Sequence, residues 1–335
     1  MLFISSKSDK KSNNIGMSEE CIENPERIQI DADSIKHQNQ VNLKELINPN
    51  KGDNSALLIL NQKIDIPKEL FYKIWKLHDL KICADGAANR LYDYVKDDES
   101  IRTKYLPDYI IGDLDSLSEK VFNYYKEKNV VIIRQTTQYS TDFTKCVNLI
   151  SLHFNSPKFH SLISNKNALQ SNHGIELEEG IHTLYNSMTK SLVFSQVTPI
   201  SLLALGGIGG RFDQTIHSIT QLYTLSKEAS YFKLCYITVT DLIFLINKNG
   251  TLIKYDPQFR NSCIGNCGLL PIGEATVINE TRGLKWDVKN WPTSVVNGRV
   301  SSSNRFVGKE CCYIDTKDDI ILNIEIFVDK LINFL

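Results

Sequence analysis

The chain has 335 residues, of which 42% are hydrophobic, and a formal net charge of −1. This length predicts two domains with room for a large hydrophobic core. The near-zero charge excludes a global basic field that would recruit nucleic acid or an anionic membrane, and no apolar stretch is long enough to span a bilayer. We therefore expect neither partner, so any anionic ligand has to be held locally by a metal ion, backbone N–H groups or a few Arg and Lys.

Eight cysteines are scattered along the chain, several of them inside apolar runs. This distribution favours reduced, buried thiols and a cytoplasmic protein. A zinc site built from Cys263, Cys267 and the Cys311-Cys312 pair is not expected, because the spacing is poor and no His falls between 218 and 335. The N-terminus starts with only four apolar residues, so no secretory leader is predicted.

Residues 1–50 are polar, with few aromatic residues and mixed charge. Such a composition is typical of a segment that buries too little apolar surface to fold. We expect a largely disordered N-terminal arm over 1–50 that activity does not require.

From residue 51 to 239, short apolar runs alternate with segments of helical spacing. Strands that alternate with helices indicate an α/β domain with a doubly wound, mostly parallel sheet. Strands are predicted at 56–60, 81–84, 109–111, 130–133, 202–205 and 231–239, and helices are predicted to begin at 67, 87, 118, 142 and 213.

The alternation breaks over 155–199, a stretch rich in Ser, Asn, Lys and His. A structureless loop of this length is uncommon within a compact domain. We interpret it as a peripheral insertion without a catalytic role, partly helical near 181–188.

After residue 240, short apolar runs are separated by Gly, Pro, Asn and Asp, and no helical pattern appears before the last residues. This texture predicts an antiparallel β-sandwich domain over 240–335.

Three carboxylates follow predicted buried strands: Asp113 and Asp115 in IGDLDSL (111–117), and Asp142 in STDFTKC (140–146). Ligands of open α/β sheets bind beyond the carboxyl ends of the strands. Hard oxygen ligands gathered there, with no His or Cys among them, suit Mg²⁺ and a phosphate-bearing substrate. For one motif alone a solvated turn or a helix cap is the better interpretation; the agreement of several motifs favours a site.

A glycine-rich segment, LGGIGGRFD (205–213), joins a predicted strand to a predicted helix. Glycine lets the backbone approach a ligand, a helix start offers N–H groups to an anion, and Arg211 adds a bidentate phosphate donor. The segment is neither a Walker motif nor G-x-G-x-x-G, because Phe212 occupies the last glycine position. A tight packing turn explains the glycines equally well, and Arg211 with Asp213 favours function.

Two further segments are ambiguous when taken singly. Asp85 in ADGAANR (84–90) reads first as a helix cap, although Asn89 and Arg90 could face the same crevice as Asp113. Trp286 reads first as a core residue, and the polar run VSSSN (300–304) as an exposed edge.

Taken together, six segments resemble the eukaryotic, fungal-type thiamine pyrophosphokinase family and occur in the family's order: ADGAANRLYDY (84–94), IGDLDSL (111–117), QYSTDFTKC (138–146), LGGIGGRFDQ (205–214), TRGLKW (281–286) and VSSSN (300–304). The resemblance implies an α/β catalytic domain followed by a thiamine-binding β-sandwich, in a homodimer with its active site at the subunit interface. It implies that thiamine and ATP react to give thiamine diphosphate and AMP, with Mg²⁺ as the cofactor.

The resemblance also groups the site residues. Three acids correspond to the family's catalytic, Mg²⁺-associated carboxylates: Asp113, Asp115 and Asp142. Five residues correspond to the nucleotide side: Asp85, Asn89, Arg90, Arg211 and Asp213. Five correspond to the thiamine side: Gln138, Trp286, Ser301, Ser303 and Asn304.

Two other functions would use the same fold. A Mg²⁺-dependent nucleotide pyrophosphohydrolase would let water replace the alcohol, and Trp286 would then need no ligand role. A non-enzymatic thiamine- or nucleotide-sensing module would need no three-carboxylate metal site, so the intact acids argue against it.

Overall fold

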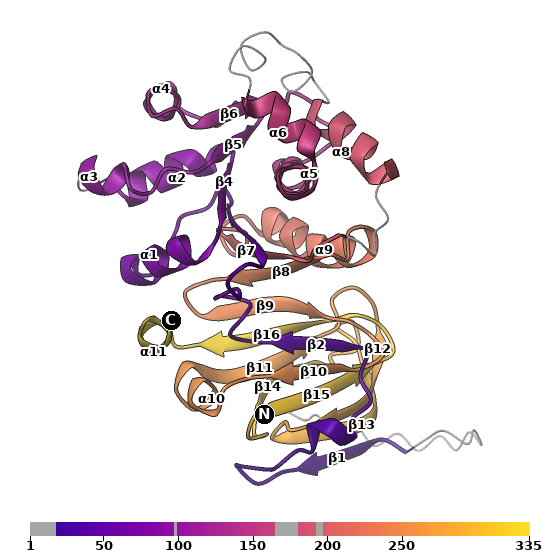
Figure 1. The fold of residues 1–335 in the computed structure, drawn as a ribbon. Helices are drawn as coiled ribbons and strands as arrows, with labels where there is room; N and C mark the ends of the chain where they lie inside the picture. Colours follow the sequence, from indigo (N-terminus) through magenta and orange to yellow (C-terminus); the bar gives the residue numbers. More distant parts are fainter. Residues whose placement is uncertain (1–17, 97–98, 165–179, 192–196) are drawn as a thin grey trace. The chain divides into compact units, whose positions relative to one another are not determined.

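The computed structural model describes residues 18–96, 99–164, 180–191 and 197–335 (Figure 1). The chain divides into two compact units. One, here called the α/β unit, spans 45–240; the other, here called the β unit, combines residues up to 44 with 241–334.

The α/β unit is built on parallel strands in the order β8-β7-β3-β4-β5-β6. The strands are β3 (Asn54–Ile59), β4 (Leu80–Ala84), β5 (Tyr109–Gly112), β6 (Val131–Arg134), β7 (Ile200–Leu205) and β8 (Phe232–Ile237). Five of the six residues of β3 are buried, as expected for a parallel strand covered on both faces. The predicted α/β fold is confirmed.

Helices cover both faces of this sheet (Figure 1). On one side lie α1 (Lys68–Leu77), α2 (Ala87–Tyr94), α3 (Glu99–Arg102) and α4 (Glu119–Glu127). On the other lie α5 (Asp142–Asn155), α6 (Pro157–Ser164), α8 (Gly180–Ser191) and α9 (Phe212–Glu228). The chain runs outward from β3 to β6 and then returns to β7 on the other side of β3. This reversal creates a topological switch point, where α/β proteins bind their ligands.

The β unit contains two groups of paired strands. One sheet has the order β1-β13-β12-β15-β10-β2, and the strands β14-β11-β16-β9 pair in a second group. Their bounds are β1 (Glu20–Glu23), β2 (Asn39–Asn42), β9 (Asp241–Ile246), β10 (Thr251–Lys254), β11 (Ile264–Leu270), β12 (Thr276–Arg282), β13 (Trp286–Thr293), β14 (Ser301–Arg305), β15 (Cys311–Thr316) and β16 (Ile320–Ile326). Three short helices complete the unit: η1 (Ala32–Ser34), α10 (Pro257–Cys263) and α11 (Val328–Phe334). Pairing is antiparallel except for β2, which runs parallel to β10.

The prediction of disorder over 1–50 is wrong for residues 18–50. β1 pairs antiparallel with β13, which puts Glu23 opposite Trp286, and β2 pairs with β10. Lys285 holds the same segment, because its Nζ donates to the Asn24 carbonyl at 2.6 Å and lies 3.2 Å from Glu23. All four residues of β1 are exposed, so this edge strand is held by backbone pairing rather than by buried apolar side chains. The amino-acid composition therefore does not reveal the strand. The prediction for 1–17 lies outside the described residues.

The predicted insertion at 155–199 contains α6 and α8, and the expected helix near 181–188 is confirmed. α8 packs against α5 and buries Ile181 and Met188. Residues 165–179 and 192–196 lie outside the described part of the chain. Helix α10 was not predicted, although Asp256 caps it through two backbone N–H groups and Pro257 opens it, both helix-start signals.

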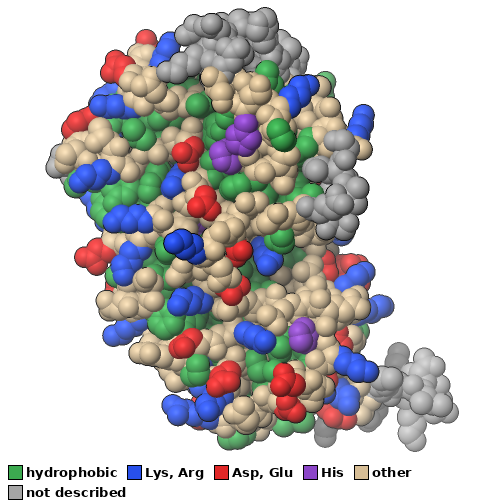
Figure 2. Space-filling view, in the orientation of Figure 1, with side chains coloured by type: hydrophobic (Ala, Val, Ile, Leu, Met, Phe, Trp, Pro, Cys, Tyr) green, Lys and Arg blue, Asp and Glu red, His purple; other side chains and the backbone are tan. Residues whose placement is uncertain are grey.

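Charge is mixed on the surface. Figure 2 shows acidic and basic side chains interspersed over the coloured part of the face in view, with no field of one sign. None of the described helices combines the length and the apolar character needed to cross a bilayer.

Candidate active site

The site begins where β4 and β5 end side by side. Asp85 follows β4 in the left-handed region, with a φ of 46°, and its N–H donates to the Ile111 carbonyl at 2.9 Å. A Cβ at Gly112 would lie 2.5 Å from Asp85 Cβ, so this position of β5 has to be glycine. The close approach of the two strand ends brings Asp85 to the loop that carries Asp113 and Asp115.

Asp85, Asp113 and Asp115 form one acidic group. Each offers a carboxylate oxygen, and these oxygens all lie within 4.8 Å of one another. Asp85 Oδ2 accepts from the Ser116 N–H at 3.3 Å, whereas Asp85 Oδ1 is buried and has no hydrogen-bond partner in the described structure. A buried acceptor without a partner, beside two more carboxylates, fits a divalent cation with a preference for oxygen such as Mg²⁺.

The electrostatics of this group also favour a cation. Burial, together with the charges of Asp142 and Asp113, raises the pKa of Asp85 to about 6. Burial acts in the same direction on Asp113, but hydrogen bonds from Gln138 and the Asp115 N–H, with the nearby Lys145 charge, outweigh it and lower the pKa of Asp113. Ionisation of Asp85 therefore costs free energy, and a bound cation would offset that cost.

Asp142 does not belong to the acidic group but lies close enough to act on it. It sits in the first turn of α5, behind the N-cap Thr141, and burial raises its pKa against the opposing effect of Lys145. Lys145 Nζ lies 3.2 Å from Asp142 Oδ1, and the Lys145 side chain is only 5% exposed. Lys145 is not among the predicted site residues, although its spacing of three residues from Asp142 on a helix signals the contact.

Two predicted ligand residues are instead engaged with the acidic loop. Gln138 Nε2 donates to Asp113 Oδ2 at 3.0 Å. Asn89 Nδ2 donates to the Ser116 carbonyl at 2.7 Å, and its Oδ1 accepts from the Ser118 N–H and hydroxyl. Both residues thus hold the loop that presents Asp113 and Asp115.

The glycine-rich loop follows β7 across the switch point. Gly206, Gly209 and Gly210 have φ angles of 70°, 98° and 61°, and a Cβ at Gly206 would lie 2.7 Å from the Leu60 carbonyl. The left-handed turn favours glycine at all three positions, and at Gly206 the close approach of a carbonyl also excludes a side chain.

The charged residues after this loop are exposed. Arg211 donates to both oxygens of Asp213, at 3.1 and 2.6 Å, and the two side chains are 76% and 62% exposed. Arg90, on α2, donates to Asn61 Oδ1 at 3.2 Å, next to Leu60. Among the other predicted nucleotide-side residues, Asp85 joins the acids and Asn89 supports their loop.

The remaining predicted residues lie in the β unit. Asn304 is buried and clips two strands together, since its Oδ1 accepts from the Trp286 N–H at 3.1 Å and its Nδ2 donates to the Trp286 carbonyl at 2.8 Å. Trp286 and Ser301 are half-buried, and Ser303 is exposed. Asn304 therefore positions Trp286, which leaves the indole and the serine hydroxyls as the groups available to a ligand.

An unpredicted acid organises the turn before Trp286. Asp287 is buried and accepts from the Thr281 hydroxyl at 2.9 Å, the Gly283 N–H at 2.9 Å and the Leu284 N–H at 3.0 Å. Asn24 Nδ2 donates to the same carboxylate at 2.6 Å. The segment TRGLKW is thus held by an acid just outside it and by the N-terminal residues.

Comparisons with known proteins identify the family of this chain. The family model of the thiamin pyrophosphokinase catalytic domain matches residues 71–234, and that of the thiamin pyrophosphokinase vitamin B1 binding domain matches residues 253–321. A thiamine pyrophosphokinase of Saccharomyces cerevisiae is 82% identical over 319 residues, which are 95% of this chain and 100% of that protein.

Solved structures give the same result. The crystal structure of yeast thiamin pyrophosphokinase is 82% identical, has a TM-score of 0.92 and covers 94% of this chain and 100% of its own. The thiamin pyrophosphokinase from Candida albicans is 36% identical, with a TM-score of 0.77, over 92% of this chain and 99% of its own. These relatives support neither the pyrophosphohydrolase nor the sensing module. The chain belongs to the thiamine pyrophosphokinase family.

Proposed function

We propose that this protein transfers the pyrophosphoryl group of ATP to the hydroxyethyl oxygen of thiamine, giving thiamine diphosphate and AMP. The observation that carries the proposal is the acidic group of Asp85, Asp113 and Asp115 at the ends of β4 and β5, in a chain 82% identical to a yeast thiamine pyrophosphokinase. Pyrophosphoryl transfer depends mainly on positioning and charge neutralisation, and this group serves both purposes.

The acidic group is proposed to hold Mg²⁺, with Asp85, Asp113 and Asp115 as its carboxylate ligands. A bound Mg²⁺ would neutralise phosphate oxygens of ATP. Asp85 was expected on the nucleotide side and Asp142 among the metal ligands; the carboxylate distances favour exchanging those two roles.

We assign to Asp142 the role of accepting the proton of the attacking hydroxyl. Its pKa is raised, which makes it a stronger base, and the Lys145 ammonium at 3.2 Å keeps it ionised. Lys145 in turn offers a fixed positive charge beside the acids, where the transferred phosphates need one.

The nucleotide and thiamine sides follow from the family resemblance. Arg211 would exchange its contact with Asp213 for an ATP phosphate beside the glycine turn, and Arg90 would contribute a second positive charge to the nucleotide side. Trp286 would face an aromatic ring of the cationic thiamine, with Ser301 and Ser303 as polar neighbours. Gln138 would orient Asp113 next to the substrate.

We further propose a cytoplasmic homodimer with its active site at the subunit interface, as the resemblance implies. The eight cysteines support the compartment, because all are free thiols and seven of them are buried.

The reaction is tested with purified protein, ATP, Mg²⁺ and thiamine. AMP and thiamine diphosphate should form in equal amounts, and AMP should not form when thiamine is omitted. AMP release without thiamine would instead identify a pyrophosphohydrolase, and an absence of turnover would identify a binding module.

A further inference from the structure

The β unit contains a cavity of about 280 Å³ whose walls come from three separate segments. They are residues 27–29, helix α10 with Arg260 and Asn261, and Lys309. The Ile28 N–H donates to the Val307 carbonyl at 3.0 Å, and the Lys309 N–H donates back to the Ile28 carbonyl at 3.0 Å. Backbone hydrogen bonds therefore fix the first and third walls against each other.

The cavity is cationic. Arg27, Arg260 and Lys309 line it, and no acidic residue does. Arg260 Nη1 donates to the Phe306 carbonyl at 3.1 Å, but its Nε is buried without a hydrogen-bond partner. Within the described chain, no ion pair or side-chain hydrogen bond engages Arg27 or Lys309.

The other arginines of the same unit are neutralised. Each pairs with a glutamate: Arg282 with Glu280 at 2.9 Å, Arg299 with Glu19 at 2.6 Å and Arg305 with Glu26 at 2.6 Å. Arg27 and Arg260 thus differ from the other three arginines of the unit, because they line the same cavity and no acidic side chain of the described residues pairs with them.

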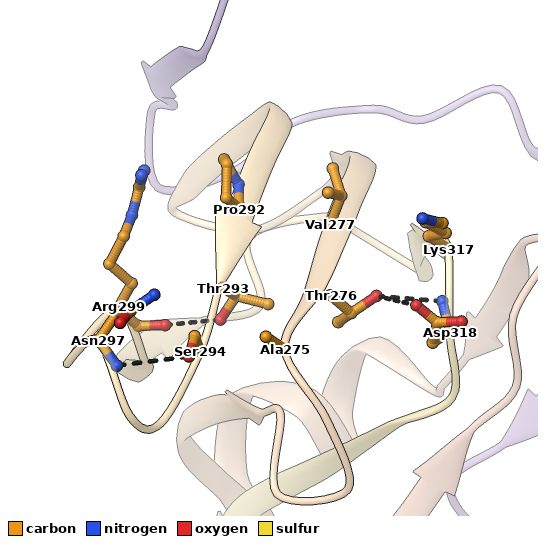
Figure 3. Close-up of a pocket in the computed structure, with 10 residues that line it drawn as sticks. All are labelled: Ala275, Thr276, Val277, Pro292, Thr293, Ser294, Asn297, Arg299, Lys317 and Asp318. Atoms are coloured by element: carbon orange, nitrogen blue, oxygen red, sulfur yellow. Dashed lines mark hydrogen bonds between the residues drawn. The ribbon is translucent and has the colours of Figure 1, made fainter.

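A second cavity of the β unit, of about 220 Å³, provides the contrast. It is lined by Arg299 and Lys317, but Asp318 lines it as well. Figure 3 shows its polar groups bonded to one another, with Thr276 donating to Asp318 at 2.8 Å and Thr293 donating to the Arg299 carbonyl at 2.7 Å. Arg299 pairs with Glu19 and Asp318 adds a negative charge beside Lys317, so this cavity lacks the three uncompensated cations of the other one.

We propose that the cavity lined by Arg27, Arg260 and Lys309 is an anion site that takes a phosphoryl group. Three like charges around one hollow repel each other, and a phosphate dianion removes that repulsion. The planar guanidinium groups match phosphate oxygens in pairs, and the amides of Gln29 and Asn261 add neutral donors. A hollow of about 280 Å³ accommodates inorganic phosphate or the phosphate end of an ester.

The test is calorimetric titration of the full-length chain with anionic probes. The buffer contains no divalent metal, because without metal the acidic group of the α/β unit repels anions and does not compete for the probes. Four probes are compared: inorganic phosphate, inorganic diphosphate, AMP and thiamine diphosphate. The double variant Arg27→Gln/Lys309→Gln should bind at least tenfold more weakly, and neither change removes a hydrogen bond of the described fold. Lys317→Gln, in the other cavity, is the matched control and should bind like the parent.

The outcomes separate the sources of the anion. A loss shared by all four probes supports a site for the phosphoryl group itself, whereas a loss limited to AMP or thiamine diphosphate supports a site for that ester. Equal affinity in parent and double variant, or no binding of any probe at about 10 mM, overturns the proposal. If the double variant fails to fold, the single variant Arg27→Gln is judged by the same criterion.

Discussion

The ionisation of Asp85 should cost the ligand-free protein stability. Its pKa rises from 3.8 to about 6, because burial and two neighbouring acids oppose its charge. A folded-state pKa above the unfolded value means that the folded chain holds more protons between these two values. Stability is therefore lost as pH rises through this window. At about 1.4 kcal/mol per pKa unit, the total penalty is about 3 kcal/mol above pH 6.

Asp85→Asn removes this charge and keeps the backbone, since Asn tolerates the φ of 46° at this position. If the new amide nitrogen takes the place of Oδ1 and makes no hydrogen bond, it lowers the unfolding free energy of the variant by about 1–3 kcal/mol. This loss does not depend on pH. The difference in unfolding free energy between variant and parent should therefore shift by about 2–3 kcal/mol in favour of the variant from pH 4 to pH 7.5.

Denaturant unfolding at the two pH values, without divalent metal, measures this shift. Asp93→Asn, at an exposed acid of α2, is the matched control and should show no comparable shift. Added Mg²⁺ should stabilise the parent more than Asp85→Asn, because the variant lacks one proposed ligand. A variant–parent difference that is the same at both pH values would refute the burial argument.

Three more perturbations probe other parts of the structure. Lys145→Met should lower kcat by about 100-fold or more, because it removes the buried positive charge beside Asp142. Lys145→Arg keeps that charge and should retain part of the activity. Equal kcat values for the two variants would contradict this role. Asp287→Ala should lower the unfolding free energy by about 3–4 kcal/mol, since four hydrogen bonds to the carboxylate disappear. A loss below about 1 kcal/mol, measured by urea unfolding, would show that these hydrogen bonds do not stabilise the fold. A chain that begins at Glu45 should lose thermal stability and activity, because β1 and β2 are removed. A chain that begins at Ser18 keeps both strands and serves as the control. Equal melting temperatures for the two chains would show that these strands are dispensable.

The sequence located the acids because parallel strands place their carboxyl ends at one edge. Asp113 and Asp115 follow β5, and the prediction needed only a buried run that ends in a polar loop. The third ligand that we propose for the metal, Asp85, differs from the predicted Asp142, because the third position depends on which strands are neighbours. β4 lies beside β5, so Asp85 reaches the group, whereas Asp142 begins a helix and pairs with Lys145.

The N-terminal strands and the turn before Trp286 were missed for a different reason. β1 exposes all its side chains and is held by backbone pairing with β13, so its residues carry no apolar pattern. Lys285, and one of the four hydrogen bonds to Asp287, reach Asn24, more than 250 positions away in the chain, and no local pattern encodes a contact of that range.

The most direct test of the central claim follows the three phosphates of ATP. Separate reactions with ATP labelled at the α, β or γ phosphorus, together with thiamine and Mg²⁺, report which bond is broken. We expect the β and γ labels in thiamine diphosphate and the α label in AMP, with neither product formed by Asp115→Asn. Label from the γ phosphorus alone in the thiamine product, release of ADP, or undiminished turnover by Asp115→Asn would contradict pyrophosphoryl transfer at this acidic group.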